Sequence, residues 1–291
     1  MPDNAKEHAS GRSGSLVVVA TPIGNLGDLS KRAAATLAGA DLIACEDTRV
    51  TAKLLAAEGI RTPMLVYHDH NAARVRPVLI ERLRQGATVA LVSDAGTPLV
   101  SDPGFKLVEA ALAEGIAITA VPGPSAILAA LVLSGLPSDR FFFAGFLPPK
   151  DAARRTEIRA LAQIPGTLIF YESATRLAKT LADLLFVLGP RRAAVARELT
   201  KRFEEVRRDR LDALVAHYAE GPPPKGEIVV LIAPPDAEEG AAATDVDLDA
   251  ALAEALAGRS VREAAALVAA ETGLPRRAVY ARALALKAGR D

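Results

Sequence analysis

Four short segments of the sequence combine glycine, proline, acidic and hydroxyl residues in a way that suits a ligand site. They are residues 21–28, 44–49, 93–104 and 121–126. Each lies at the end of an apolar run typical of a strand, and in α/β proteins ligands bind beyond the carboxyl ends of strands. Glycine allows close backbone approach, and a helix N-terminus offers free amide groups. These segments therefore predict a pocket for a polar small molecule.

Each segment also has a purely structural interpretation. Segment 21–28 lacks the G-x-G-x-x-G dinucleotide fingerprint and is equally an ordinary turn between a strand and a helix. Glu46, Asp47 and Arg49 cluster at a strand end, where a structural ion pair is as good an explanation as a site. The turns at 94–96 and 102–104 could simply cap the helix that follows, although polar loops at strand ends more often line pockets.

Other kinds of chemistry find little support. His68 and His70 would face the same side of a strand, but no third ligand is apparent, so we expect no metal. Cys45 lies within a strand and is expected to be a small core residue rather than a nucleophile. The sequence contains no P-loop, G-x-S-x-G or kinase signature.

Short apolar runs alternate with amphipathic stretches, a pattern that predicts an α/β layer architecture. Strands are expected at 16–20, 41–46, 64–67, 88–93, 117–121, 141–146, 167–171, 193–198 and 228–233. Helices are expected at 30–38, 51–58, 72–85, 105–114, 125–133, 152–163, 175–188 and 211–218.

The chain is expected to fall into five parts. Residues 1–15 would be a disordered leader, 16–120 an N-terminal α/β lobe and 121–233 a C-terminal α/β lobe. Residues 234–258 would be an acidic linker, because 236–254 hold seven acidic residues and no basic one. Residues 259–291 carry seven basic and three acidic residues and begin with a capping box at Ser260 and Glu263, which predicts a basic helical hairpin.

The amino-acid composition excludes several further classes of protein. The 291 residues are half hydrophobic, and Lys+Arg 35 balances Asp+Glu 35. One cysteine excludes a disulfide scaffold and a Cys-cluster zinc site, which fits a protein of the reducing cytoplasm. The absence of any long apolar run predicts that no segment spans a membrane. Zero net charge argues against a uniformly basic nucleic-acid coat, so any RNA contact must come from a local cluster of charge.

Six motifs together resemble a known family. They are Ala-Thr-Pro-Ile-Gly-Asn-Leu-Gly-Asp-Leu at 20–29, Glu-Asp-Thr-Arg at 46–49, Ser-Asp-Ala-Gly-Thr-Pro at 93–98 with Ser-Asp-Pro-Gly at 101–104, Val-Pro-Gly-Pro-Ser-Ala at 121–126, Phe-Tyr-Glu-Ser at 170–173 and Arg-Glu-Leu-Thr-Lys at 197–201. In this order they resemble the family of small-subunit rRNA methyltransferases I within the tetrapyrrole methylase superfamily. The resemblance covers about residues 16–233, and the basic tail is similar to the family's C-terminal extension.

The resemblance implies an α/β, two-lobed tetrapyrrole-methylase-like fold with a C-terminal helical extension. It implies S-adenosyl-L-methionine (SAM) as the cofactor, bound between the lobes, and a homodimer. The implied reaction is 2′-O-methylation of one decoding-region cytidine in 16S rRNA, either free or in the 30S subunit. By motif it places these residues near the cofactor: Pro22, Ser93, Asp94, Ala95, Val100, Ser125, Ala126, Glu172 and Gly226.

A ribose hydroxyl is a weak acid, so methylation requires a group that accepts its proton. Glu46, Glu198 and Lys201 stand at strand ends and are the candidate catalytic residues, with His68 less favoured. Lys201 would need a lowered pKa to act as a base, or it would instead orient the RNA.

Arg49 and Arg176 are candidates to hold RNA phosphates. Two rival functions stay open: a tetrapyrrole methyltransferase of the same superfamily, and a non-catalytic RNA-binding assembly factor. The basic tail would bind rRNA or, alternatively, pack on the partner subunit.

Overall fold

The computed structural model describes residues 14–235, 248–272 and 276–288. The chain divides into two compact units, residues 1–161 with 166–233 and residues 162–165 with 234–291. Nearly all of the predicted leader and the greater part of the acidic run lie outside the described residues.

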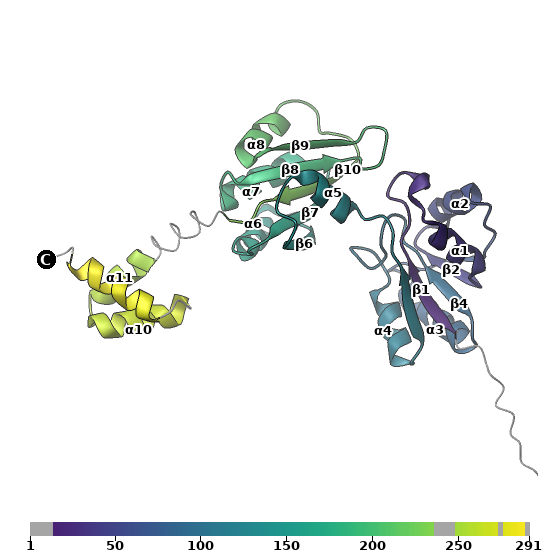
Figure 1. Cartoon of the computed structure of the whole chain (residues 1–291), viewed down its shortest axis with the longest axis horizontal. Coiled ribbons are helices and arrows are strands. Elements are labelled where there is room, and N and C mark those ends of the chain that lie inside the picture. Colours follow the sequence, from purple (N-terminus) through teal and green to yellow (C-terminus); the bar gives the residue numbers. More distant parts are fainter. Residues whose placement is uncertain (1–13, 236–247, 273–275, 289–291) are drawn as a thin grey trace, which may run out of the picture. The chain divides into compact units, whose positions relative to one another are not determined.

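The first lobe contains a parallel sheet with the strand order β3-β2-β4-β1-β5. Figure 1 labels β1, β2 and β4 of this sheet. Its strands are β1 (Ser15–Val19), β2 (Leu42–Cys45), β3 (Met64–Val66), β4 (Thr88–Leu91) and β5 (Ala117–Val121). Helices α1 (Lys31–Gly39) and α2 (Thr48–Ala57) contribute to one hydrophobic cluster, and α3 (Ala72–Arg84) and α4 (Phe105–Ala113) to another.

Strand β2 explains why these strands are apolar throughout. Leu42 and Ala44 pack into the cluster with α3, whereas Ile43 and Cys45 pack into the cluster with α1. Successive side chains point to opposite faces, so a sheet covered on both faces needs continuous apolar runs. The prediction that Cys45 is a core residue is confirmed, since its side chain is fully buried.

The second lobe contains a mixed sheet with the order β6-β7-β10-β8-β9. Its strands are β6 (Phe141–Phe146), β7 (Thr167–Ser173), β8 (Arg192–Arg197), β9 (Glu205–Arg210) and β10 (Glu227–Ile232). Helix α5 (Ala126–Ser134) packs on β8 and β10, while α6 (Asp151–Leu161), α7 (Leu177–Leu188) and α8 (Leu211–Ala219) pack side by side. The predicted α/β class with two sheet-containing lobes is confirmed.

Strand β9 was not predicted, and its composition explains why. Its sequence, Glu-Val-Arg-Arg-Asp-Arg, contains a single apolar residue, Val206. An edge strand has only one neighbour and is often charged, so it lacks the alternating apolar pattern that identifies central strands.

Within the described residues of the second unit, three helices pack together, and residues 248–256 of the predicted linker are helical. A helix including residues 248–256 precedes α10 (Val261–Thr272) and α11 (Arg276–Ala288). Leu248, Leu252 and Ala255 recur at helical spacing and are buried in its core, which is why the predicted linker stops short of residue 258. The capping box is present, with the Ser260 amide donating to the Glu263 carboxylate at 3.0 Å.

No helix within residues 14–235, 248–272 and 276–288 is long and apolar enough to cross a membrane.

Candidate functional site

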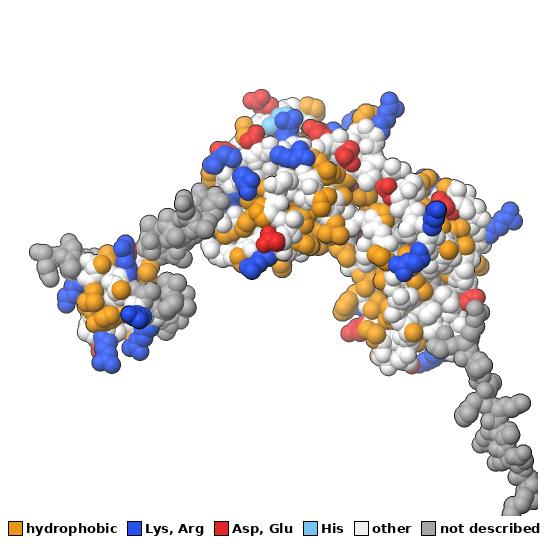
Figure 2. All heavy atoms as spheres, viewed as in Figure 1, with side chains coloured by type: hydrophobic (Ala, Val, Ile, Leu, Met, Phe, Trp, Pro, Cys, Tyr) orange, Lys and Arg blue, Asp and Glu red, His pale blue; other side chains and the backbone are white. Residues whose placement is uncertain are grey.

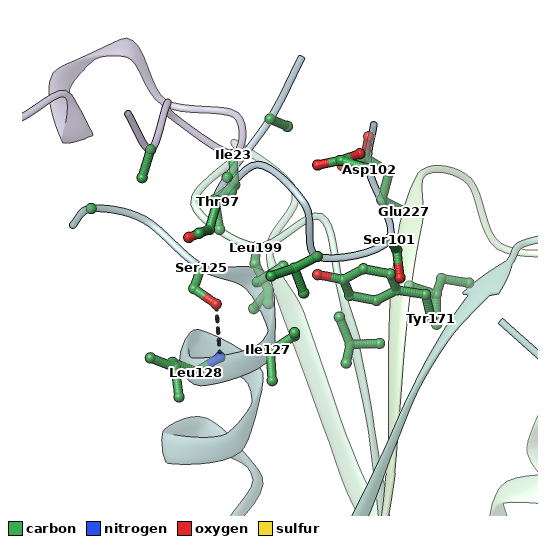
Figure 3. Close-up of a pocket in the computed structure, with 18 of the residues that line it drawn as sticks. Ile23, Thr97, Ser101, Asp102, Ser125, Ile127, Leu128, Tyr171, Leu199 and Glu227 are labelled. Atoms are coloured by element: carbon green, nitrogen blue, oxygen red, sulfur yellow. Dashed lines mark hydrogen bonds between the residues drawn. The ribbon is translucent and has the colours of Figure 1, made fainter. Parts of the chain in front are cut away.

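A cavity of about 700 Å³ opens among loops of both lobes (Figure 3). Its walls are mainly apolar, with a few hydroxyl and carboxyl groups, as in small-molecule sites of this size. The lining includes Ile23, Ala95, Gly96, Thr97, Val100, Ser101, Asp102, Pro122, Gly123, Ser125, Ala126, Ile127, Phe146, Tyr171, Glu172, Leu199, Gly226 and Glu227.

Strand order explains why three motifs of the first lobe meet at this cavity. Strands β4, β1 and β5 are parallel neighbours, so the loops that follow them leave the same edge of the sheet. Thr21 and Gly96 pair across two of these loops through backbone hydrogen bonds of 2.9 and 3.0 Å. A Cβ on Gly123 would lie 3.1 Å from the Cβ of Ala20, so a small residue is needed where the third loop passes the first.

The second lobe contributes one edge of its sheet in the same way. Strand β10 runs antiparallel to β7 and β8, which places the start of β10 beside the ends of the other two. Glu227 therefore faces Ser173 in register, and the Glu198 amide donates to the Glu227 carbonyl oxygen at 3.0 Å.

Six of the predicted cofactor residues line the cavity: Ala95, Val100, Ser125, Ala126, Glu172 and Gly226. Pro22, Ser93 and Asp94 do not line it, and the last two support the loops behind it. The Ser93 carbonyl oxygen accepts a hydrogen bond from the Thr21 hydroxyl, and the Asp94 carboxylate accepts one from the Asp47 amide at 3.1 Å. The Glu-Asp-Thr-Arg motif thus reaches the site through Asp94.

The carboxylate of Glu172 is bound by other residues of the second lobe. It accepts hydrogen bonds from the Thr180 hydroxyl and from the amide and hydroxyl of Ser173, and it pairs with Arg176 at 3.4 Å. Arg176 also donates to the carbonyl oxygen of Leu147 at 2.7 Å. Both side chains therefore hold the second lobe together, which leaves Arg176 poorly suited to bind an RNA phosphate.

None of the three predicted catalytic residues lines the cavity. The Lys201 ammonium bridges the Glu198 carboxylate at 3.0 Å and the Glu227 carboxylate at 2.9 Å. Although burial lowers the pKa of Lys201, its hydrogen bonds to Glu227 and Glu198 more than compensate, so its pKa is raised. The same contact with Lys201 lowers the pKa of Glu198. A lysine with a raised pKa and a carboxylate with a lowered one are both poor proton acceptors.

Glu46 differs from this pair. Burial, followed by the charges of Asp94 and Asp102, raises the pKa of the Glu46 carboxyl group. Arg49 makes a bidentate ion pair with Asp47, which holds the pKa of that partly buried carboxyl at about 2. The structural interpretation of this cluster therefore applies to Asp47, which also caps α2.

Asp102, Tyr171 and Glu227 are titratable cavity groups that the sequence analysis did not assign as site residues, although Asp102 lies in the segment 93–104 that was expected to line a pocket. Burial raises the pKa of the Asp102 carboxyl group, an effect that a Ser93 hydrogen bond opposes. Burial and the charges of Asp102 and Glu227 raise the pKa of Tyr171 to about 12, so its phenol stays protonated. Figure 3 shows Tyr171, Ser101 and Asp102 among the residues that line the cavity.

Two loops at the cavity hold strained backbone. Leu99 and Ser101 have φ values of 74° and 63°, and Glu198 and Thr200 have values of 51° and 63°. Among the described residues these are all of the non-glycine positions with positive φ. Strain of this kind persists only where surrounding contacts impose it, and it clusters at functional sites.

Gly226 is expected to be intolerant of a side chain. Its φ is +96°, and a Cβ there would lie 2.2 Å from Oε1 of Glu198, which Lys201 holds in place. We expect Gly226→Ala to destabilise the fold by about 3 kcal/mol and to weaken ligand binding in the cavity. Gly115→Ala is the matched control, because its φ of +67° imposes similar strain but no atom lies within 4 Å. Equal falls in melting temperature for the two variants would contradict the steric argument.

The described residues contain no group of three or more His, Cys, Asp or Glu side chains arranged to hold a metal ion. His68 and His70 do lie together, with ring centroids 5.8 Å apart.

Two family models match the chain. The model described as "Tetrapyrrole (Corrin/Porphyrin) Methylases" matches residues 15–215, and that described as "RsmI C-terminal HTH domain" matches 242–287. A protein of Mesorhizobium japonicum named "Ribosomal RNA small subunit methyltransferase I" is 52% identical over 94% of this chain and 92% of its own length. A protein of the same name from Escherichia coli O157:H7 is 43% identical over 96% of this chain and 98% of its own.

Solved structures share the fold at lower identity. Uroporphyrin-III C-methyltransferase from Thermus thermophilus, in a complex with S-adenosyl homocysteine, superimposes with a TM-score of 0.53 at 23% identity, over 75% of this chain and 96% of its own. Diphthine synthase superimposes with a TM-score of 0.58 at 19% identity, over 75% of this chain and 89% of its own.

Proposed function

This chain belongs to the tetrapyrrole (corrin/porphyrin) methylase family, and we propose that it uses SAM to methylate the ribose 2′-hydroxyl of a decoding-region cytidine in 16S rRNA, cytidine 1402. One observation carries the choice of an rRNA substrate. The relatives named for rRNA align over 94% and 96% of the chain, whereas the uroporphyrin-III methyltransferase covers 75%. An enzyme for free tetrapyrroles has no evident need for the additional helical unit.

The cavity suits SAM on the grounds of size and chemistry. Ile23, Ile127 and Leu199 offer apolar walls for an adenine ring, and the loops at Gly96 and Gly123 expose backbone polar groups at close range. Asp102 and Glu227 supply negative charge for a cationic ligand. When bound, SAM supplies an electrophilic methyl group.

We propose that Asp102 accepts the proton of the ribose hydroxyl. It lines the cavity, and its raised pKa brings its basicity closer to neutral pH, where a general base works best. Tyr171 contacts Phe143 and Phe146 at ring-centroid distances of 4.8 and 5.6 Å, and these contacts hold its ring in place. Its protonated hydroxyl orients the ribose hydroxyl that receives the methyl group. Lys201 and Glu198 act as positioning residues, and Glu46 is the second candidate base.

Radiolabelled SAM distinguishes the three functions. The purified chain is incubated with 30S subunits or free 16S rRNA from cells that lack this methyl group, and 2′-O-methyl positions are mapped by resistance to alkaline cleavage. We expect label at one cytidine. Label appearing instead in a uroporphyrinogen-type substrate would favour the tetrapyrrole reaction, and RNA binding without transfer or SAM binding would favour an assembly factor.

The helical unit is proposed to bind rRNA through its basic side chains. Removing residues 236–291 should reduce kcat/KM for rRNA by about tenfold or more, because phosphate contacts supply much of the affinity of RNA-binding proteins. Binding of SAM, followed by calorimetry, should change little. Equal losses in both assays would indicate instead that the unit packs on a partner subunit.

We also propose that the chain forms a homodimer. Large apolar side chains remain exposed on β6 and α5: Phe141, Phe142, Phe146, Leu128 and Val132. Figure 2 shows hydrophobic surface over the part of the lobe where β6 and β7 are labelled in Figure 1. Light scattering should give twice the 30.4 kDa chain mass, and a mass of one chain would rule the dimer out.

A further inference from the structure

The connection between β8 and β9, residues 198–204, forms part of the rim of the cavity. Leu199 lines the cavity, and Lys201 pairs with Glu227 at the start of β10. Arg197 donates to the Lys225 carbonyl oxygen at 3.3 Å, which holds the segment before β10 beside this connection. A group projecting from the connection therefore stands next to the entrance of the site.

The rim carries an excess of positive charge. Residues 197–204 and 225–227, which make up this rim, include four basic and three acidic side chains, in a chain whose net charge is zero. Within the part of the chain that the structure describes, no carboxylate forms an ion pair with the exposed side chains of Arg202, Arg208 and Lys225. Figure 2 shows basic and acidic side chains interspersed over the region of β8 and β9. A neutral chain needs local positive charge of this kind in order to bind RNA.

Phe203 is the second unusual feature of the rim. Its side chain is 64% exposed, although phenylalanine is normally buried. The guanidinium of Arg202 lies 5.5 Å from the centre of its ring. An exposed aromatic ring beside a cation that has no carboxylate partner is typical of surfaces that bind single-stranded RNA, because bases stack on the ring while cations contact the phosphates.

We propose that Arg202 and Phe203 form an RNA-docking element that receives the nucleotides flanking the target. Phe203 stacks on an unpaired base, and Arg202 and Lys225 contact the neighbouring phosphates. Methylation of a ribose inside the cavity requires the target nucleotide to leave its stack, and a base held at the rim stabilises that extended strand. This inference rests on the proposed rRNA substrate.

The test compares Phe203→Ala with Phe186→Ala. Phe186 is a matched control, since it is 66% exposed and has Arg155 at 4.7 Å from its ring, but it belongs to α7 rather than to the connection that carries cavity residue Leu199. We expect Phe203→Ala to raise the Kd for 30S subunits and lower kcat/KM by about tenfold, with SAM affinity unchanged. Phe203→Trp should restore both values, and Phe186→Ala should leave them unchanged.

Direct binding of 30S subunits separates this inference from the proposed reaction. If the wild-type chain binds subunits but transfers no methyl group, the reaction is wrong, and the Kd of Phe203→Ala still tests the docking element. A change of less than twofold, or equal changes for both alanine variants, would overturn the inference. A Phe203→Ala chain that becomes monomeric while the wild type is dimeric would also overturn it, since the ring would then belong to a subunit interface.

Discussion

Replacing Asp102 with asparagine is expected to slow methyl transfer to rRNA by about two to three orders of magnitude, because general base catalysis contributes an effect of this size. Asparagine has nearly the same shape but does not accept the proton. The Kd for SAM should change by only a few-fold, since the apolar walls and the backbone of the cavity remain. Single-turnover rates with saturating cofactor measure the chemical step directly.

The dependence of the rate on pH provides an independent check. Burial raises the pKa of Asp102 above its ordinary value, so the wild-type rate should begin to fall at a higher pH than an unperturbed aspartate would dictate. The residual activity of Asp102→Asn should not show this fall in rate at acidic pH. If Asp102→Asn keeps more than a tenth of the activity while Glu46→Gln loses it, the proton acceptor is Glu46.

The same substitution should stabilise the fold at neutral pH. A carboxyl group whose pKa is raised by folding contributes stability that is fully present below its unfolded pKa, about 3.9, and is lost as the pH rises through the folded value. Asparagine stays neutral and avoids that loss. Thermal unfolding at pH 7 should therefore give Asp102→Asn a melting temperature at least equal to that of the wild type. A melting temperature of Asp102→Asn below that of the wild type would show that the ionised carboxylate of Asp102 stabilises the fold.

Replacing Arg154 with methionine is expected to produce the largest loss of stability, about 3–5 kcal/mol. Arg154 and Asp183 are 2% and 3% exposed, and their closest N–O distance is 2.6 Å. Methionine fills much of the space but leaves the Asp183 carboxylate buried with Arg155 as its remaining partner. It also removes the donor to the carbonyl oxygen of Pro149, in the turn that follows cavity residue Phe146.

Urea unfolding of Arg154→Met should have a lower midpoint urea concentration than that of the wild type. The dependence of the unfolding free energy on urea concentration should be unchanged. Arg159→Met is the control, because Arg159 is exposed on the same helix. The double variant Arg154→Met/Asp183→Leu should recover part of the loss, since an apolar pair often replaces a buried ion pair with little cost. A loss below 1 kcal/mol for Arg154→Met would mean that Arg155 alone satisfies the carboxylate.

Local patterns in the sequence determined the elements and the loops that matter. The central strands of the first sheet are buried on both faces, so their runs of Val, Leu, Ile and Ala predict them directly. The capping box at Ser260 and Glu263 works in the same way, because its two hydrogen bonds join residues three positions apart. The polar loops after β1, β4 and β5 were recognised because glycine and proline mark turns regardless of which segments pack against them.

Tertiary structure alone decided which of these groups meet and what charge they carry. Lys201 and Glu198 stand at a strand end as predicted, but strand pairing brings Glu227 to them from another segment and converts them into an ion-paired support. Asp102 becomes a cavity group because a strained loop carries it there. Partner distance and burial set the pKa of a side chain, and both depend on segments remote in sequence, which no local pattern encodes.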